Sequence, residues 1–411
     1  MNPGCGAQYT GISHINMVII LLLALFPSLL GATEITTGFL LGPKYDHRAF
    51  YIRNSPGEAW QKTYSSGEYR PQAKGKLMNI RLVQALYHDE WLTAKPFDPE
   101  ANTNAVIAAL DFYKSHGVLM INICLQGGQA GYDHQIYGLD RSNGYRYGPE
   151  KGTHVSAFRP DGSLKPEWLG RLERLLAAAD QRGMIVNIMY FYQGQDELFE
   201  STEAIHRAAR DITDWLIQKK FRNVIIDIAN EWDLPGDRWD FAKYIPENIL
   251  QLIKETRDRF QKLHADYALP ISISSDGRMN YAESFLESVD VVLLHGNGRT
   301  PAQKLQRTAD LKNWERPILM NEDDNGRTST AAHLSAELAS CDAFFDHAAG
   351  WGYMPWVQAQ RFPFRFLPSG PSEVRDDLPE KDRDMAYFHA VLDHMAKLTM
   401  KRPPHSGKGS K

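Results

Sequence analysis

The chain has 411 residues, of which 43% are hydrophobic and 23% are charged, as in an ordinary soluble globular protein. Its formal net charge of -4 and its sequence pI near 6.4 argue against a nucleic-acid partner. The length leaves room for one large domain or for several smaller ones.

The first element along the chain is a short apolar run, "MVIILLLALFPSLLGA", at residues 17–32. A run of this length that ends in small residues is typical of a secretory signal, and it is too short for a comfortable membrane span. We therefore predict a signal peptide over residues 1–32, an exported mature chain and no stable membrane partner. An uncleaved membrane anchor is the alternative, because residues 1–16 carry no Lys or Arg.

Two segments flank the main body of the sequence. Residues 33–76 contain loop-like stretches, and we predict that they form a short N-terminal extension, a hairpin or coil that closes the bottom of the main fold. The basic end, residues 401–411, predicts a disordered tail. Neither segment is assigned any chemistry.

Strand-like and helix-like patterns alternate over residues 77–400. The strand-like runs are almost continuously apolar, as expected for parallel strands covered on both faces. They lie at 77–86, 117–126, 183–192, 223–230, 271–275, 289–295, 316–321 and 351–358. Apolar residues recur at helical spacing between them, as in Leu169, Leu172 and Leu176. This spacing predicts helices at 101–115, 169–182, 205–215, 249–263, 281–288, 301–312, 329–347 and 382–398.

Strict alternation of strands and helices at this length predicts an α/β fold, a single (β/α)8 TIM barrel. The rival is an open doubly wound sheet, which usually carries a glycine-rich phosphate turn after its first strand. Here the first strand runs into "YHDEW" instead. Within the barrel, a long loop follows the second strand and holds several tyrosines, among them Tyr137 and Tyr145. Such a loop is either a ligand-binding lid or a structural cap over the barrel.

Active sites of this fold lie at the carboxyl ends of the strands. The residues expected there are His88, Asp89, Glu90, Gln126, Tyr192, Gln193, Gln195, Asn230, Glu231, Trp232, Asp233, Asp276, His295, Asn297, Asn321, Glu322, Asp323, Trp356 and Gln358. Strands four and seven both end in Asn-Glu, in "DIANEWD" and "LMNEDD". The two glutamates, Glu231 and Glu322, are therefore expected to meet across the mouth of the barrel. Two facing carboxylates are the catalytic groups of most glycoside hydrolases.

With these motifs the chain resembles the large superfamily of retaining (β/α)8 glycoside hydrolases, the cellulase-like "4/7" group. The resemblance implies that Glu231 is the acid/base and Glu322 the nucleophile. It further implies that Trp356 in "MPWVQ" is the aromatic that ends strand eight, and that His295 lies near the nucleophile. One departure is Trp232, which stands where that group often has Pro after the strand-four Glu.

Several other residues are predicted to bind substrate. Asn230 is expected to hydrogen-bond the sugar 2-hydroxyl, and Trp356 to stack under the sugar ring. His295, Tyr192, Gln126, Tyr137 and Tyr145 complete the predicted carbohydrate-binding set.

No cofactor and no metal are predicted, since "LYHDEW" lacks the His-x-His that barrel metallohydrolases usually carry after strand one. The alternatives are a non-catalytic carbohydrate-binding barrel and, less favoured, a metal-dependent hydrolase.

Overall fold

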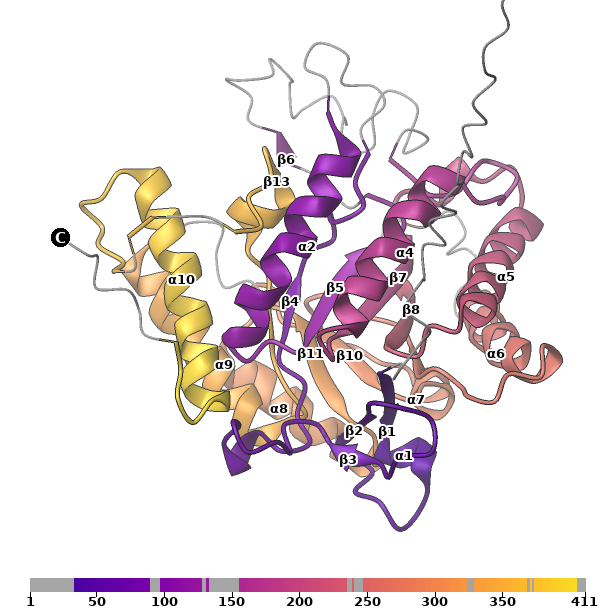
Figure 1. Cartoon of the computed structure of the whole chain (residues 1–411), viewed down its shortest axis with the longest axis horizontal. Coiled ribbons are helices and arrows are strands. Elements are labelled where there is room, and N and C mark those ends of the chain that lie inside the picture. The colour runs from indigo at the N-terminus through magenta and orange to yellow at the C-terminus, as the bar shows by residue number, and fades with distance from the viewer. Residues whose placement is uncertain are drawn as a thin grey trace, which may run out of the picture. The chain divides into compact units, whose positions relative to one another are not determined.

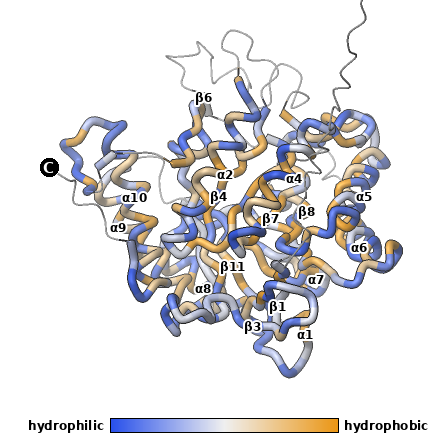
Figure 2. The backbone as a smooth tube through the Cα atoms, in the orientation of Figure 1, coloured by the Kyte–Doolittle hydropathy of each residue, from blue (hydrophilic) through white to orange (hydrophobic). Residues whose placement is uncertain are grey.

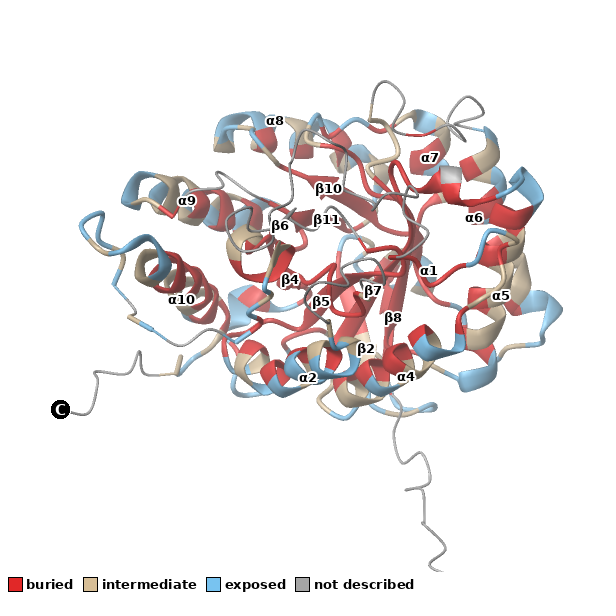
Figure 3. Ribbon diagram, turned by 90° about the horizontal axis from the view of Figure 1, so that it is seen from above, coloured by how far each residue is buried: buried red, intermediate tan, exposed pale blue. Residues whose placement is uncertain are grey.

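A computed structural model describes residues 33–88, 97–127, 131–132, 155–234, 239, 247–323, 329–367, 370–371 and 373–404. Gly31–Lys411 forms one compact unit. In this unit the parallel strands lie in the middle and the long helices surround them (Figures 1 and 3).

The eight expected strands are all present, and all of their pairings are parallel. Six form one sheet in the order β12-β4-β5-β7-β8-β9, and β10 and β11 form a second sheet. Single parallel bridges join the two sheets, from Ser274 to Leu293 and from Asp323 to Tyr353. This is the strand order of a (β/α)8 barrel, as predicted. The strands are β4 (Asn79–Arg81), β5 (Met120–Cys124), β7 (Ile185–Tyr192), β8 (Val224–Asn230), β9 (Ile271–Ser272), β10 (Val292–His295), β11 (Ile318–Glu322) and β12 (Gly352–Tyr353).

A helix follows each strand on the outside of the barrel. Asp98 caps the first helix and Ser201 caps the third through side-chain oxygens that accept backbone N–H bonds. The helices are α2 (Pro99–Ser115), α4 (Pro166–Asp180), α5 (Thr202–Lys219), α6 (Glu247–Lys262), α7 (Glu283–Ser288), α8 (Pro301–Leu311), α9 (Ala331–His347) and α10 (Glu380–Thr399). All eight predicted helices are confirmed, with ends that shift by a few residues.

Hydrophobic residues gather in the middle of the unit, and hydrophilic residues lie along the outer faces of the helices (Figure 2). The central strands are covered on both sides; every residue of β7 and of β8 is buried. This explains why their sequences are nearly continuous apolar runs rather than alternating ones. Among the described residues, none of the helices has the length and apolar character needed to cross a membrane.

The N-terminal extension forms a small antiparallel sheet of β1 (Glu34–Thr37), β2 (Phe50–Arg53) and β3 (Gln61–Lys62), with a short helix α1 (Gly38–Leu41). The backbone N–H of Ile35 donates to the carbonyl of Arg222, just before β8 begins. This contact places the small sheet at the amino ends of the barrel strands, opposite the end where active sites form.

Several predicted strands are longer than the observed ones, and two of these differences affect the site. The run 77–86 contributes only Asn79–Arg81 to the barrel, because the turn that follows is itself buried and apolar. Arg81 therefore ends strand one, and His88 lies beyond the turn that follows it; Asp89 and Glu90 lie outside the described residues. The run 351–358 contributes only Gly352–Tyr353, and Trp356 begins a π-helical turn, η7 (Trp356–Gln360).

Remaining elements are short. They are β6 (Gly131–Tyr132), β13 (Arg361–Phe362), and the 3-10 helices η1 (Pro71–Ala73), η4 (Asp196–Leu198) and η6 (Lys312–Trp314). The pair β6 and β13 is parallel, so the segment after strand two meets the segment after strand eight.

Candidate active site

The two glutamates that end strands four and seven meet at the mouth of the barrel. One carboxylate oxygen of Glu231, one of Glu322 and one ring nitrogen of His295 all lie within 4.8 Å of one another. His295 Nδ1 is 3.1 Å from Glu231 Oε1 and 3.3 Å from Glu322 Oε2. The imidazole thus bridges the two carboxylates.

Strand register brings His295 beside Glu322. The two residues are paired on the neighbouring strands β10 and β11, and the register shifts between Leu294 and His295. An irregularity of this kind re-aims the side chain that follows it, and such irregularities are over-represented next to active sites.

A left-handed backbone turn aims the Glu231 side chain. Its φ is +52°, a conformation that costs an L-residue about 1–2 kcal/mol. Two hydrogen bonds to the Glu231 carbonyl hold the turn, from Leu234 N at 3.1 Å and from Trp239 Nε1 at 3.1 Å. Trp232, which follows, packs on Phe285 of α7 with ring centroids 4.4 Å apart. Strain of this size persists where the surroundings over-determine it, as they do here.

Arg81 is the charge partner of Glu322. Its Nε lies 2.6 Å from Glu322 Oε2, and its side chain is only 1% exposed. Burial alone lowers the pKa of Arg81, but the neighbouring Glu322, Tyr192 and Glu231 raise it above its usual value. The guanidinium therefore stays charged. The other oxygen of Glu322, Oε1, accepts a hydrogen bond from Asn297 Nδ2.

Asn230 and Gln193 connect Arg81 to Glu231. Arg81 NH2 donates to Asn230 Oδ1 at 2.8 Å, and Asn230 Nδ2 donates to Gln193 Oε1 at 2.6 Å. Gln193 Nε2 then donates to Glu231 Oε2 at 2.7 Å. Both ends of the Asn230 amide are thus engaged by protein groups, and the residue is fully buried.

The electrostatics of His295 follow from these contacts. Burial lowers the pKa of His295, whereas the charge of Glu322 and the hydrogen bond with Glu231 raise it, and the net shift is upward. The imidazole therefore keeps its proton to higher pH than an exposed histidine does.

A buried ion pair supports the strand that carries Glu322. Lys304 Nζ lies 2.6 Å from Asp323 Oδ1, and both side chains are 0% exposed. Trp351 Nε1 donates to Asp323 Oδ2 at 2.8 Å, and Lys304 donates to Ser340 Oγ at 3.0 Å. Asp323 is therefore held inside the fold, whereas its neighbour Glu322 lies in the cluster with Glu231.

Two other residues that were predicted to bind substrate, Tyr192 and Gln126, are buried in the barrel. Tyr192 is buried against Val83, Cys124 and Met189 inside the barrel. Gln126 is fully buried, and its Oε1 accepts from the backbone N–H of Tyr192 at 2.9 Å.

Trp356 is half-buried at the start of η7, beyond the end of β12. Tyr137 and Tyr145 lie outside the described residues. Sugar contact by any of these residues stays a prediction.

Sequence reasoning did not assign a role to three residues of the site. Arg81 gave a signal, since it is the only charged residue in the apolar run 77–86. Gln193 and Asn297 were expected at strand ends. The position of an amide side chain at a strand end does not reveal which carboxylate it will contact. Only the register of neighbouring strands, in which Tyr192 lies opposite Asn230, shows that Gln193 and Glu231 are neighbours.

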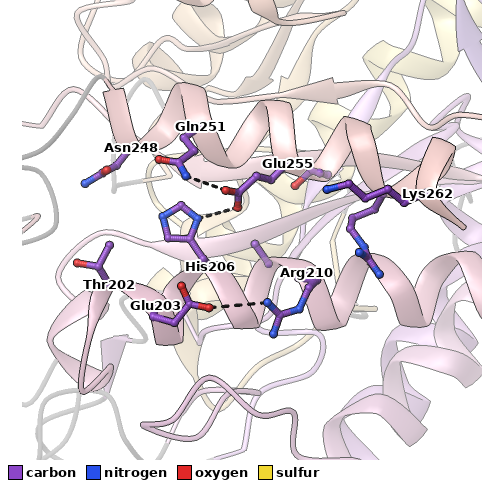
Figure 4. A pocket seen from close by; sticks show the side chains of 11 residues that line it. Thr202, Glu203, His206, Arg210, Asn248, Gln251, Glu255 and Lys262 are labelled. Atoms are coloured by element: carbon purple, nitrogen blue, oxygen red, sulfur yellow. Dashed lines mark hydrogen bonds and ion pairs between the residues drawn. The ribbon is translucent and has the colours of Figure 1, made fainter.

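A separate surface pocket of about 590 Å³ lies between α5 and α6 (Figure 4), and neither Glu231 nor Glu322 lines it. Several of its polar side chains are engaged with one another. His206 Nδ1 lies 2.7 Å from Glu255 Oε2, and Gln251 donates to Glu255 Oε1 at 2.7 Å. The candidate active site is instead the barrel mouth, where the facing carboxylates, the charged arginine and the strained turn converge.

Glu231, His295 and Glu322 also form the kind of group that is able to hold a metal ion. Arg81 opposes this, because its guanidinium already neutralises Glu322 at 2.6 Å and would repel a cation there. The arrangement fits a carboxylate pair for acid–base and nucleophilic chemistry better than a metal centre.

Comparison with known proteins gives a limited result. No family model matches the chain, and no curated protein matches it. Among solved structures, an endo-1,4-β-mannanase from Rhizomucor miehei is similar, with 13% identity, a TM-score of 0.49, and 82% of this chain and 98% of that chain covered. A glycoside hydrolase family 5 enzyme from Prevotella bryantii has 10% identity, a TM-score of 0.48 and coverage of 81% and 99%.

Proposed function

We propose that this protein is a glycoside hydrolase that cleaves O-glycosidic bonds of a poly- or oligosaccharide with retention of configuration. The single observation that carries the proposal is the meeting of Glu231 and Glu322, with His295, within 4.8 Å at the mouth of the barrel. Binding a sugar does not need two facing carboxylates, whereas hydrolysis through a glycosyl–enzyme intermediate does.

The spacing of the carboxylates supports the retaining mechanism. Retaining enzymes hold their two carboxyl groups about 5–5.5 Å apart, while inverting enzymes leave about 6.5–9.5 Å for a water molecule. One oxygen of Glu231 and one oxygen of Glu322 lie within 4.8 Å of each other, which favours the shorter spacing.

In this mechanism Glu322 attacks the anomeric carbon and Glu231 protonates the departing oxygen. Arg81 and Asn297 each hold one oxygen of Glu322, and this fixes the plane of the nucleophile. Glu231 then removes a proton from water, which attacks the anomeric carbon and releases the sugar. His295, Trp356, Tyr192, Gln126, Tyr137 and Tyr145 remain proposed contributors to substrate binding. Asn230, whose amide is engaged at both ends by Arg81 and Gln193, is proposed to act through these residues.

We further propose that the chain acts outside the cytosol, on the basis of the apolar run at residues 17–32. N-terminal sequencing of secreted protein tests this, and a mature start near Thr33 is expected. An intact N-terminus in the membrane fraction would support an anchor instead.

The test of the activity is a panel of aryl glycosides with different sugars, assayed with the wild type and with Glu322→Ala. We expect turnover of at least one glycoside by the wild type and its loss in the variant. Affinity for sugars without turnover by the wild type would favour a non-catalytic binding barrel. Loss of turnover after treatment with a chelator, and its return with a divalent cation, would favour a metal-dependent hydrolase.

A further inference from the structure

We propose that Gln193 is a positioning residue for the acid/base, and that Arg81 sets its orientation through Asn230. This inference rests on the proposed function, because it assigns to Glu231 the role of acid. Gln193 does not touch the reacting bond in this scheme. It holds the Glu231 carboxyl group in the plane from which the proton is delivered.

A closed ring of polar contacts joins the two glutamates. The ring runs from Glu322 to Arg81, Asn230, Gln193, Glu231 and His295, and returns to Glu322. Each contact lies between 2.6 and 3.3 Å. The two carboxylates are thereby connected on one side by His295 alone and on the other side by three residues.

The direction of the hydrogen bonds in this ring follows from chemistry. Arginine has donors only, so the atom of Asn230 that faces Arg81 must be its carbonyl oxygen. The amide nitrogen of Asn230 then faces Gln193 and requires an acceptor, which is Oε1 of Gln193. Gln193 is left with its N–H group toward Glu231. A permanent charge thus fixes two amide orientations in succession.

The hydrogen bond from Gln193 constrains the position of the proton on Glu231. Because Gln193 donates to Oε2, the proton that Glu231 transfers must lie on Oε1 or on the other lone pair of Oε2. The backbone turn at φ +52° fixes the base of the side chain, and Gln193 and His295 each hold one oxygen. A flexible side chain is thereby held in one geometry before substrate arrives, which is what proximity and orientation effects require.

Direct sugar contact is the competing role for Gln193. The residue is only 2% exposed, and both ends of its amide face protein groups. The neighbouring Gln195 supplies a matched comparison, because it is a buried glutamine on the same segment whose amide donates to the carbonyl of Gly127 rather than to a carboxylate.

The experiment compares Gln193→Met with Gln195→Met on aryl glycosides of one sugar with leaving groups of graded acidity. Methionine keeps the length of the side chain and removes the donor. For Gln193→Met we expect kcat/KM to fall about 10- to 100-fold with the poorest leaving group, and by less than about 3-fold with the most activated one, which hardly needs an acid. Gln195→Met should change kcat/KM by a factor that does not depend on the leaving group.

Azide provides a second readout. It attacks the glycosyl–enzyme without needing a general base, so it should accelerate turnover of an activated substrate by Gln193→Met and not by Gln195→Met. A loss in Gln193→Met that is equal across leaving groups, with no azide effect, would overturn the positioning role. If the wild type turns over none of the glycosides, the proposed function fails instead, and the two failures are therefore distinguishable.

Discussion

The Nε atom of Arg81 lies 2.6 Å from Oε2 of Glu322, and the two side chains are only 1% and 6% exposed. An ionised carboxylate is costly to bury unless a charge and hydrogen bonds compensate for the lost water. Arg81 supplies the compensating charge to the proposed nucleophile and Asn297 supplies a hydrogen bond, while the NH2 group of Arg81 supports Asn230 at the same time. One buried cation thus organises both halves of the proposed catalytic pair.

Replacement of Arg81 tests this relationship. We expect Arg81→Met to lower the free energy of unfolding by about 3–5 kcal/mol, because it leaves a buried charge without its partner. Activity should fall strongly with both activated and poor leaving groups, since the nucleophile is affected in either case. Arg81→Lys should rescue little, because an ammonium group does not reproduce the planar fork that contacts Glu322 and Asn230.

The matched control is Arg222→Met. Arg222 is also largely buried and pairs with Glu34 and Asp266, but at the opposite end of the barrel. Arg222→Met should lower the free energy of unfolding, and the protein that stays folded should keep the kcat of the wild type. Near-wild-type activity of Arg81→Met would contradict the role given to Arg81.

The pair of Lys304 and Asp323 is expected to be strongly coupled in stability. Either Lys304→Met or Asp323→Asn alone should cost about 3–5 kcal/mol, because each leaves a fully buried group without its partner. The double variant should cost clearly less than the sum of the two single changes. A double-mutant cycle in urea measures this, and additive single effects would show that the pair is not coupled.

The buried carboxyl group of Asp227 makes stability depend on pH. Burial raises its pKa from 3.8 to about 6, although Ser274, His295 and Arg81 act in the opposite direction. The folded protein therefore holds this proton more tightly than the unfolded chain does. The charged group destabilises the fold above pH 6, and the destabilisation is relieved as pH falls from about 6 toward 4.

We expect Asp227→Asn to raise the free energy of unfolding at pH 7.5 by up to about 3 kcal/mol, and by much less at pH 4.5. Urea unfolding at the two pH values measures the difference. Asp310→Asn, a change at an exposed position of α8, should give no comparable gain. A gain from Asp227→Asn that is the same at both pH values would show that desolvation of this carboxyl group is not its cause.

Much of the fold was predictable, because parallel strands buried on both faces leave a clear pattern. Residues 183–192 and 223–230 correspond closely to β7 and β8. The predicted end of the first strand was wrong at residues 77–86, where an apolar run continues past the end of β4 into a buried turn. Hydrophobicity records burial and not hydrogen bonding, so it does not mark where such a strand ends.

The candidate site was predictable only in part. The two Asn-Glu pairs indicated Glu231 and Glu322, because strand order alone brings the ends of strands four and seven to one mouth. The contacts that hold them were not predictable, since they depend on register and on side-chain direction. Arg81 on β4 reaches Glu322 on β11 past the short strand β12, and Gln193 reaches Glu231 from the neighbouring strand.

The central claim is the division of labour between Glu231 and Glu322, and the configuration of the azide product tests it most directly. With an activated aryl glycoside, Glu231→Ala should form the intermediate, and azide should then give a glycosyl azide of retained configuration. Glu322→Ala should be inactive without azide, and with azide it should give the inverted product. Products of the same configuration from both variants, with the fold intact, would contradict the assignment of acid/base to Glu231 and nucleophile to Glu322.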